Sequence, residues 1–263
     1  TVNLYDRIEM DRNGDGVIKT ETNLPFVPDG EGNLAWRAAK LLLDEKGIRD
    51  GVTIKIRKFI PVAAGMAGGS TDAAAVLVGV NRMFDLGFTK KELMERGVKL
   101  GADVPYCIMR GTALSEGIGE ILTELPAPPQ CHLVIAKPQI SVSTKAVYGK
   151  LRVNELAPEE HPDIDGMMES IKNGDLDGVI GRLGNVLETV TVPDHPEIAE
   201  IKKVMMENGA CGSLMSGSGP TVFGIYKDKE QAEKACQALR EADGGRLTRQ
   251  VYLTEFYNRK KAR

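Results

Sequence analysis

The sequence predicts an α+β protein of two domains. Its 263 residues are 42% hydrophobic, which is enough for one large core or two modest ones at ~100–150 residues per domain. Segments with the two-residue period of strands alternate with segments at helical spacing. The proline-rich stretch Leu125–Pro129 interrupts this pattern. We therefore expect an N-terminal domain over residues 1–125 and a C-terminal domain over residues 126–263.

Three elements are predicted in the N-terminal domain. A helix is expected to begin after Asn33, a good N-cap, and to end at Gly47. Val52–Phe59 alternates β-branched or aromatic residues with polar ones, which is typical of a half-buried strand. Ser70–Phe84 is apolar on most of its helical circumference, which predicts a buried helix. The residues expected to cap the start of that helix are Ser70, Thr71 and Asp72.

The C-terminal domain is predicted to contain strands and helices in alternation, as in an α+β fold. Its first strand directly follows the proline-rich stretch. In chain order, the expected elements are a strand at Leu133–Ala136, helices around Ile164–Ile171 and Ile198–Glu207, a strand at Thr221–Tyr226, a helix at Lys229–Ala242 and a strand at Arg249–Thr254.

Charge and composition argue against several classes of partner. The net charge is -3 and the pI is about 5.8, and the only dense basic run is Arg259–Lys261, so nucleic acid is not an expected partner. No apolar stretch reaches the roughly 18 residues needed to span a bilayer, and Thr1–Asp6 does not resemble a signal peptide. We expect no membrane partner and a cytoplasmic location.

Cysteine and histidine are too scattered for a metal or redox site. The four cysteines form no CxxC pair, so we expect reduced and mostly buried thiols. The three histidines have no metal-ligand spacing, and no catalytic role is predicted for them. These residues are Cys107, Cys131, Cys211 and Cys236, with His132, His161 and His195.

A loop of small residues joins the strand at Val52–Phe59 to the buried helix. Small residues let the backbone approach a phosphate closely, and the N–H groups at a helix start bind negative charge. The loop therefore predicts a phosphate cradle, in which a side chain at Gly68 would occupy the space of the phosphates. It is neither a Walker A loop nor a dinucleotide fingerprint. The loop consists of Pro61, Val62, Ala63, Ala64, Gly65, Met66, Ala67, Gly68, Gly69, Ser70 and Thr71.

Two further segments carry candidate chemistry. Gly101–Pro105 places Asp103 in a loop, where its carboxylate could accept a proton from a substrate hydroxyl. Met215–Thr221 is a second loop of small residues that could close backbone donors around a substrate phosphate. Taken alone, either segment would more often be an ordinary turn.

In this order and spacing, the three segments resemble the three signature motifs of the GHMP kinases, named for galactokinase, homoserine kinase, mevalonate kinase and phosphomevalonate kinase. Within that superfamily, the chain resembles most the kinases that act on a cytidine-diphosphate-linked methylerythritol. The additional segments that carry this resemblance are Asn33–Ala35, Ile60–Pro61, Leu114–Glu120 and Val142–Thr144.

The resemblance implies a fold and an activity. The fold would combine an N-terminal domain like domain 2 of ribosomal protein S5 with a ferredoxin-like C-terminal domain. The activity would be the ATP-dependent phosphorylation of the 2-hydroxyl of 4-diphosphocytidyl-2-C-methyl-D-erythritol, in the non-mevalonate route to isoprenoid precursors. The cofactors would be ATP and Mg²⁺, the substrate a small molecule, and the protein a monomer or homodimer.

The resemblance also implies roles for particular residues. Pro61–Thr71 would wrap the ATP phosphates, with Asn33 and Lys58 near the nucleotide. Asp103 would be the catalytic carboxylate and would contact the substrate. Ser70 would contact a phosphate or Mg²⁺. The second loop would bind substrate through Gly217, Ser218 and Gly219.

The start of the chain departs from the family pattern. Family members begin with a Lys-x-Asn-Leu strand and an Asp-Gly-Tyr-His segment, and neither is present, so we expect a chain that lacks about thirty N-terminal residues. One alternative is a kinase of the homoserine or mevalonate type, against which Gly101–Pro105 argues. A second alternative is a non-catalytic nucleotide-binding protein, which the missing lysine favours and the retention of Asp103 and both loops disfavours.

Overall fold

The computed structural model describes residues 1–257, so the basic run Arg259–Lys261 lies outside the described residues. The chain divides into two compact units. The N-terminal unit comprises Leu4–Val62 and Ala67–Glu124. The C-terminal unit comprises Thr1–Asn3, Ala63–Met66 and the chain from Leu125 on. Each unit contains helices and strands, and the α+β class predicted from the sequence is confirmed.

The N-terminal unit contains a three-stranded sheet in the order β1-β3-β2. The central strand β3 (Gly51–Arg57) pairs antiparallel with β1 (Arg7–Asn13) and parallel with β2 (Ile18–Thr22). Strand β3 confirms the predicted strand, although it ends two residues earlier, at Arg57. Its buried side chains alternate with exposed ones, as expected when one face of a sheet is covered.

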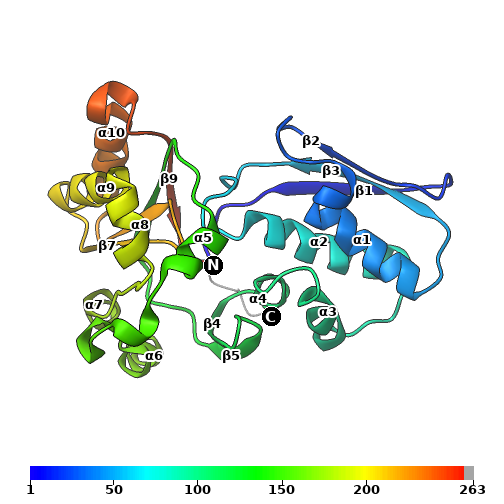
Figure 1. Ribbon diagram of the computed structural model, residues 1–263, viewed down its shortest axis with the longest axis horizontal. Helices are drawn as coiled ribbons and strands as arrows, with labels where there is room; N and C mark the ends of the chain where they lie inside the picture. Colours follow the sequence, from blue (N-terminus) through cyan, green and yellow to red (C-terminus); the bar gives the residue numbers. More distant parts are fainter. Residues whose placement is uncertain (258–263) are drawn as a thin grey trace. The chain divides into compact units, whose positions relative to one another are not determined.

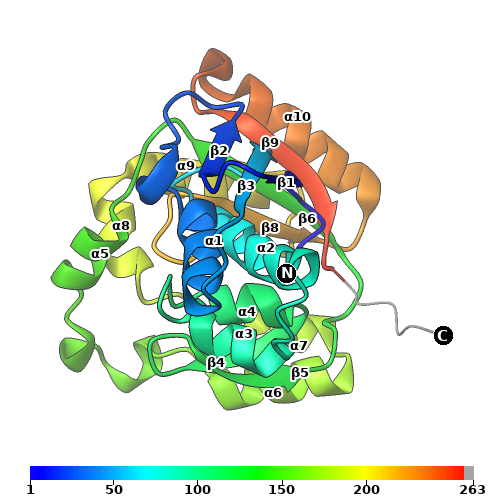
Figure 2. The same ribbon diagram turned by 90° about the vertical axis from the view of Figure 1, so that its right-hand side faces the viewer.

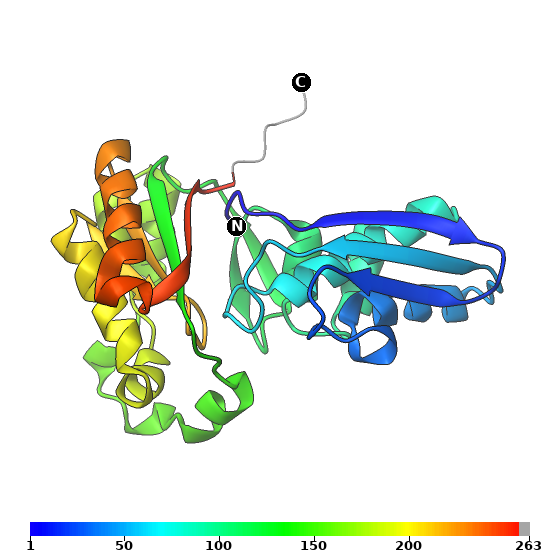
Figure 3. The ribbon, with the colours of Figure 1, turned by 90° about the horizontal axis from the view of Figure 1, so that it is seen from above.

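Helices α1 (Leu34–Glu45) and α2 (Gly68–Met83) pack against each other and cover one face of this sheet (Figures 1 and 3). The predicted N-cap of α1 is confirmed, because the Asn33 side chain accepts a hydrogen bond of 2.9 Å from the Ala35 N–H. The buried residues of α1 recur at helical spacing. They are Ala35, Ala38, Ala39, Leu42 and Leu43.

Shorter elements complete the N-terminal unit. Helix α4 (Val104–Met109) packs against α2 and against α3 (Lys90–Gly97). Strands β4 (Thr112–Glu116) and β5 (Ile121–Leu125) form a two-stranded sheet. The sequence had suggested a loop before an apolar segment where α4 lies, so Asp103 directly precedes a helix that had not been predicted.

The C-terminal unit contains a four-stranded antiparallel sheet in the order β7-β8-β6-β9. Helices α9 (Pro196–Glu207) and α10 (Lys229–Gly245) pack against each other and against this sheet, and Figure 2 shows α10 alongside β9. The chain order of strands and helices gives the split β-α-β arrangement of ferredoxin-like domains. The four strands are β6 (His132–Pro138), β7 (Gly212–Met215), β8 (Val222–Tyr226) and β9 (Thr248–Glu255).

Most elements predicted in this half of the chain are present, with shifts of a few residues at their ends. The regular part of helix α10 ends where it was predicted to end, because the backbone leaves helical angles at Ala242, Asp243 and Gly244. The remaining helical segments lie between β6 and α9. They are α5 (Thr144–Lys150), α6 (Ile164–Asn173), α7 (Leu176–Gly181), α8 (Glu188–Asp194) and the 3-10 turns Val153–Glu155 and Pro158–Glu160.

The cysteines of the described chain are all free, as expected. Cys131 and Cys236 are buried, Cys107 is half-buried and Cys211 is exposed. No helix within residues 1–257 is both long enough and apolar enough to cross a bilayer.

Candidate active site

The glycine loop leads directly into helix α2. The helix begins at Gly68, after Ala67 in the left-handed conformation (φ 50°), and no described side chain caps it. The expectation that Ser70, Thr71 and Asp72 cap this helix is therefore wrong, because the two glycines extend the helix and place these residues inside it. The uncapped N–H groups at its start suit an anionic ligand.

The two central glycines of the loop have different packing roles. Gly65 has a φ of 68°, and a side chain there would collide with the Ser216 carbonyl; the Ser216 hydroxyl also donates a 2.9 Å hydrogen bond to the Gly65 carbonyl. A Cβ at Gly68 would lie 3.1 Å from Ile60 Cγ2 and 3.4 Å from Lys58 Nζ. A side chain at Gly68 would therefore also press against Ile60 and Lys58, and its expected overlap with the phosphates stays a prediction.

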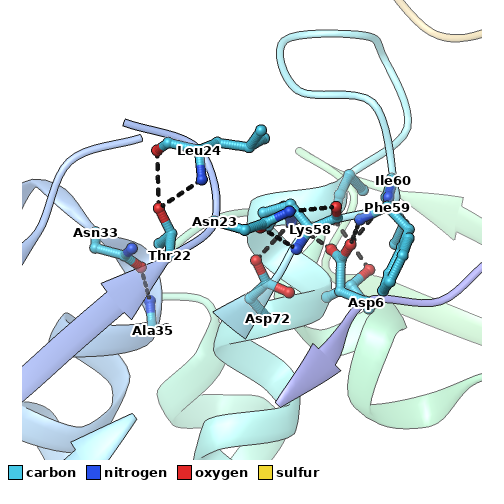
Figure 4. A network of polar contacts seen from close by, with 12 residues as sticks. Asp6, Thr22, Asn23, Leu24, Asn33, Ala35, Lys58, Phe59, Ile60 and Asp72 are labelled. Atoms are coloured by element: carbon cyan, nitrogen blue, oxygen red, sulfur yellow. Dashed lines mark hydrogen bonds and ion pairs between the residues drawn. The ribbon is translucent and has the colours of Figure 1, made fainter. Parts of the chain in front are cut away.

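Lys58 lies at the entrance to the glycine loop and is buried. Its side chain is 4% exposed, and its ammonium group forms ion pairs with the carboxylates of Asp6 and Asp72, the latter at 2.6 Å. Figure 4 shows the two carboxylates on either side of the lysine. Lys58 is therefore not a solvent-exposed strand lysine. A contact between Lys58 and the nucleotide stays a prediction.

Asp72 is the member of this group whose pKa is shifted by burial. Burial raises the pKa of Asp72 to about 7, because it disfavours the charged carboxylate; the neighbouring Lys58 ammonium opposes the rise and the Asp6 carboxylate adds to it. The Oδ1 atom of Asp72 is buried without a hydrogen-bond partner among the described residues. Two carboxylates thus share one ammonium group directly beneath the start of α2.

The Asn33 side chain makes hydrogen bonds that stabilise the start of α1. Besides capping the helix, its side chain donates a 3.0 Å hydrogen bond to the Pro28 carbonyl, and the residue is 7% exposed. Both polar atoms of the side chain therefore have protein partners. The predicted proximity of Asn33 to the nucleotide is not tested by these contacts.

Asp103 has the properties expected of a group that is free to act on a ligand. It is exposed, and although it occupies the N-cap position of α4, its side chain makes no capping hydrogen bond. A Cβ at Gly101 would lie 3.9 Å from the Ser70 hydroxyl. Because two residues span at most about 7 Å of chain, the Asp103 backbone lies within roughly 13 Å of that hydroxyl. The common alternative of a capping aspartate does not hold.

The second loop, Ser216–Thr221, connects β7 to β8 and is held by side chains of its own unit. Asn185 Nδ2 donates to the carbonyls of Met215 (2.9 Å) and Gly217 (2.8 Å). The Ser218 hydroxyl is paired with the Thr144 hydroxyl at 2.9 Å. Ser218 is buried, so its side chain serves the loop itself, and the predicted substrate contacts of Gly217, Ser218 and Gly219 stay predictions.

Sequence reasoning missed the residues that support the two loops. Asp6, Asn23 and Asn185 contact loop residues 30 or more positions away, so no local pattern indicates them. Within residues 1–257, no group of three or more histidine, cysteine, aspartate or glutamate side chains could hold a metal ion.

Comparisons with known proteins match both halves of the chain. The model of the GHMP kinases N terminal domain matches residues 33–111, and that of the GHMP kinases C terminal region matches residues 167–244. A relative from Lachnospira eligens, 4-diphosphocytidyl-2-C-methyl-D-erythritol kinase, is 53% identical over 98% of this chain and 88% of its own length.

Solved structures share the fold. A crystal structure of 4-(cytidine 5'-diphospho)-2C-methyl-D-erythritol kinase is similar with a TM-score of 0.79 and 31% identity, covering 98% of this chain and 88% of that one. The homoserine kinase from Cytophaga hutchinsonii also gives a TM-score of 0.79, at 21% identity over 95% of this chain and 84% of that one. At that identity the second likeness concerns the fold alone.

Proposed function

Because this chain belongs to the GHMP kinases, we propose that it transfers the γ-phosphoryl group of ATP to the 2-hydroxyl of 4-diphosphocytidyl-2-C-methyl-D-erythritol. The observation that carries this proposal is the 53% identity to a kinase of that name over 98% of the chain. The predicted division into an ATP-binding domain and a substrate domain, a cytoplasmic location, and a monomer or homodimer are part of the same proposal.

The start of α2 would bind the phosphates of ATP. Its N–H groups have no capping side chain, and the glycines before it leave room for a close approach of phosphate oxygens. Mg²⁺ would be bound mainly by the phosphates, with the Ser70 hydroxyl as a protein contact, and would neutralise their charge. Phosphoryl transfer requires mainly such positioning and charge neutralisation from a protein.

Asp103 would orient the attacking hydroxyl and accept its proton. The exposed carboxylate makes no capping bond, and its segment runs close to Ser70 at the start of α2. These two facts support the proposal that Asp103 is a free proton acceptor near the phosphate site. A general base must come within hydrogen-bond reach of the hydroxyl in the substrate complex.

Asp103→Asn tests this role. The substitution keeps the size of the side chain and removes the charge, so turnover of the cytidylyl substrate by protein expressed from its complete reading frame should fall roughly 10²–10⁴-fold. The affinity for a non-hydrolysable ATP analogue, measured by calorimetry, should change less than about threefold, because the carboxylate acts on the acceptor. A matched control is Asp85→Asn, which changes another exposed aspartate of the same unit and should retain full turnover.

The same assay separates the alternatives. Turnover of homoserine or mevalonate without turnover of the cytidylyl substrate would move the assignment to another branch of the superfamily. Binding of the ATP analogue without turnover of any of these acceptors, in protein expressed from its complete reading frame, would favour a non-catalytic nucleotide-binding protein.

A further inference from the structure

We propose that Asp6 and Asn23 are positioning residues for ATP: they hold Lys58–Ile60, the chain that enters the glycine loop, in its binding conformation before the nucleotide arrives. This inference rests on the proposed function, since it assigns a purpose to the fixed conformation of that loop. Neither residue is expected to touch ATP.

Asp6 holds the segment from the side of β1. Its Oδ1 atom accepts hydrogen bonds from the N–H groups of Phe59 (2.6 Å) and Ile60 (2.9 Å), and its Oδ2 atom accepts from the Lys58 ammonium group. The Asp6 side chain is 2% exposed. One buried carboxylate thus binds three consecutive residues, and such charge-assisted hydrogen bonds are stronger than those between neutral groups (Figure 4).

Asn23 holds the same segment from the side of β2. Its Oδ1 atom accepts from the Lys58 N–H at 2.7 Å, and its Nδ2 group donates to the Lys58 carbonyl at 3.3 Å. The register of the sheet explains this symmetry: β1 begins opposite Arg57 and β2 ends opposite Ile56. Side chains from both neighbouring strands therefore continue the hydrogen bonding at the point where strand pairing ends.

The C-terminal end of the glycine loop is also connected to Lys58. The Lys58 ammonium forms an ion pair of 2.6 Å with Asp72, which lies on α2 just after the loop. Gly68 lets the first turn of α2 approach Lys58 and Ile60. The strand end and the helix start are thus joined beneath the loop, so its N–H groups are arranged before a ligand binds.

A preorganised loop should affect the binding of ATP more than the chemical step. Loss of the anchors would leave the loop to be ordered by ATP itself, which weakens binding in the ground state and the transition state alike. Variants that lack these hydrogen bonds should therefore have a higher KM for ATP than the unaltered protein, with little change in kcat. A purely structural role would instead reduce the folded fraction, which lowers the apparent kcat and leaves KM for ATP unchanged.

The experiment compares Asn23→Ala, Asp6→Asn and Asp6→Ala with the unaltered protein. Asn23 is an exposed residue, so its substitution should leave the fold intact. We expect KM for ATP to rise roughly threefold to tenfold in Asn23→Ala and more than tenfold in Asp6→Ala, since several hydrogen bonds are lost. The KM for ATP of Asp6→Asn should lie between those of Asn23→Ala and Asp6→Ala, because the amide oxygen of asparagine can still accept hydrogen bonds from the backbone. KM for the acceptor and kcat should stay within about twofold.

The matched control is Glu45→Gln, which removes a charge that pairs α1 to Arg96 on α3 and has no role at the loop. Its KM for ATP should equal that of the unaltered protein. An unchanged KM for ATP in Asn23→Ala and Asp6→Asn would overturn the proposal, and these two variants decide it even where Asp6→Ala fails to fold.

Calorimetric titration with a non-hydrolysable ATP analogue separates the two proposals. Absence of turnover in protein expressed from its complete reading frame would refute the proposed function, yet the analogue would still report on the loop. In that case, equal analogue affinities for the unaltered protein and Asn23→Ala would refute the positioning role, whereas weaker binding by the variant would support it.

Discussion

At the scale of single residues, the ionisation of Asp72 links the buried charges to the stability of the protein. Its pKa is about 7 in the folded state, against an ordinary value of 3.8. The folded protein therefore retains a proton that the unfolded chain releases between these values. The resulting stabilisation is fully present below about pH 4 and is lost as the pH rises through about 7.

Asp72→Asn should remove this dependence. An amide cannot ionise, so the stability of the variant should change less between pH 5 and pH 8 than that of the unaltered protein, and the variant should be the more stable of the two at pH 8. Urea unfolding at the two pH values measures both effects. A useful control is Asp15→Asn, which alters an exposed aspartate paired with Lys19 and should keep the pH dependence. Parallel pH profiles for Asp72→Asn and the unaltered protein would contradict the prediction.

The same residues show what the sequence could predict at this scale. The cap made by Asn33 was predictable because a cap depends on residues two positions apart. The burial of Lys58 was not, because its partners Asp6 and Asp72 are 52 and 14 positions away. A lysine that follows an alternating strand has the pattern of an exposed residue until its tertiary partners are known.

At the scale of elements, the start of α2 offers a cleaner test of the phosphate cradle than Gly68 does. Gly69 is exposed, and a Cβ there would make only an ordinary contact, 3.5 Å from Leu34 Cδ1. Gly69→Val should therefore leave the urea midpoint nearly unchanged, while the branched side chain occupies the approach of the phosphates. Affinity for the ATP analogue should fall at least about tenfold, the loss of roughly 1.4 kcal/mol.

The control for this prediction is Gly181→Val. Gly181 is also a helical glycine, at the end of α7, and it has open space around its Cα. The substitution should leave ATP-analogue affinity unchanged. Equal affinities for Gly69→Val and the unaltered protein would mean that the start of α2 does not bind the phosphates.

Elements were predictable where the local pattern was strong. Strands β6 and β8 are continuous runs of apolar and β-branched residues, and they lie where they were expected. Strand β1 was missed because charged residues make up most of its sequence, and its apolar side chains Ile8 and Met10 are only partly buried against the core. Helix α4 was missed because it has only six residues, with proline at the second position, and so short a segment does not show a detectable helical period.

At the scale of the whole molecule, residues 1–257 contain one large hydrophobic core in each unit, with no buried side chain in common, and a smaller cluster of Cys131, Leu133 and Ile225. One core is built from the sheet β1-β3-β2 and the helices α1 to α4, and it includes Leu77. The other is built from the four-stranded sheet with α9 and α10, and it includes Leu239. Length and composition allow one large core or two modest ones, and the sequence predicted two domains. It could not show that Ala63–Met66, inside the glycine loop, group with the C-terminal unit, because that grouping depends on the contact of Gly65 with Ser216.

Because the two units have separate cores, we expect each unit to unfold in its own transition, and a substitution in one core should affect only the transition of that unit. Trp36 is the single tryptophan of the chain and lies on α1, where its indole N–H donates to the Ile18 carbonyl at 3.0 Å, so its fluorescence reports the N-terminal unit. Leu77→Ala and Leu239→Ala each remove a fully buried side chain, and each should cost about 2–5 kcal/mol. Urea lowers the free energy of unfolding by about 1–3 kcal/mol per molar, so Leu77→Ala should lower the fluorescence midpoint by roughly 0.7 M or more. Leu239→Ala should leave that midpoint in place and shift only part of the circular dichroism transition. Equal shifts of both signals in both variants would show that the two cores unfold as one cooperative unit.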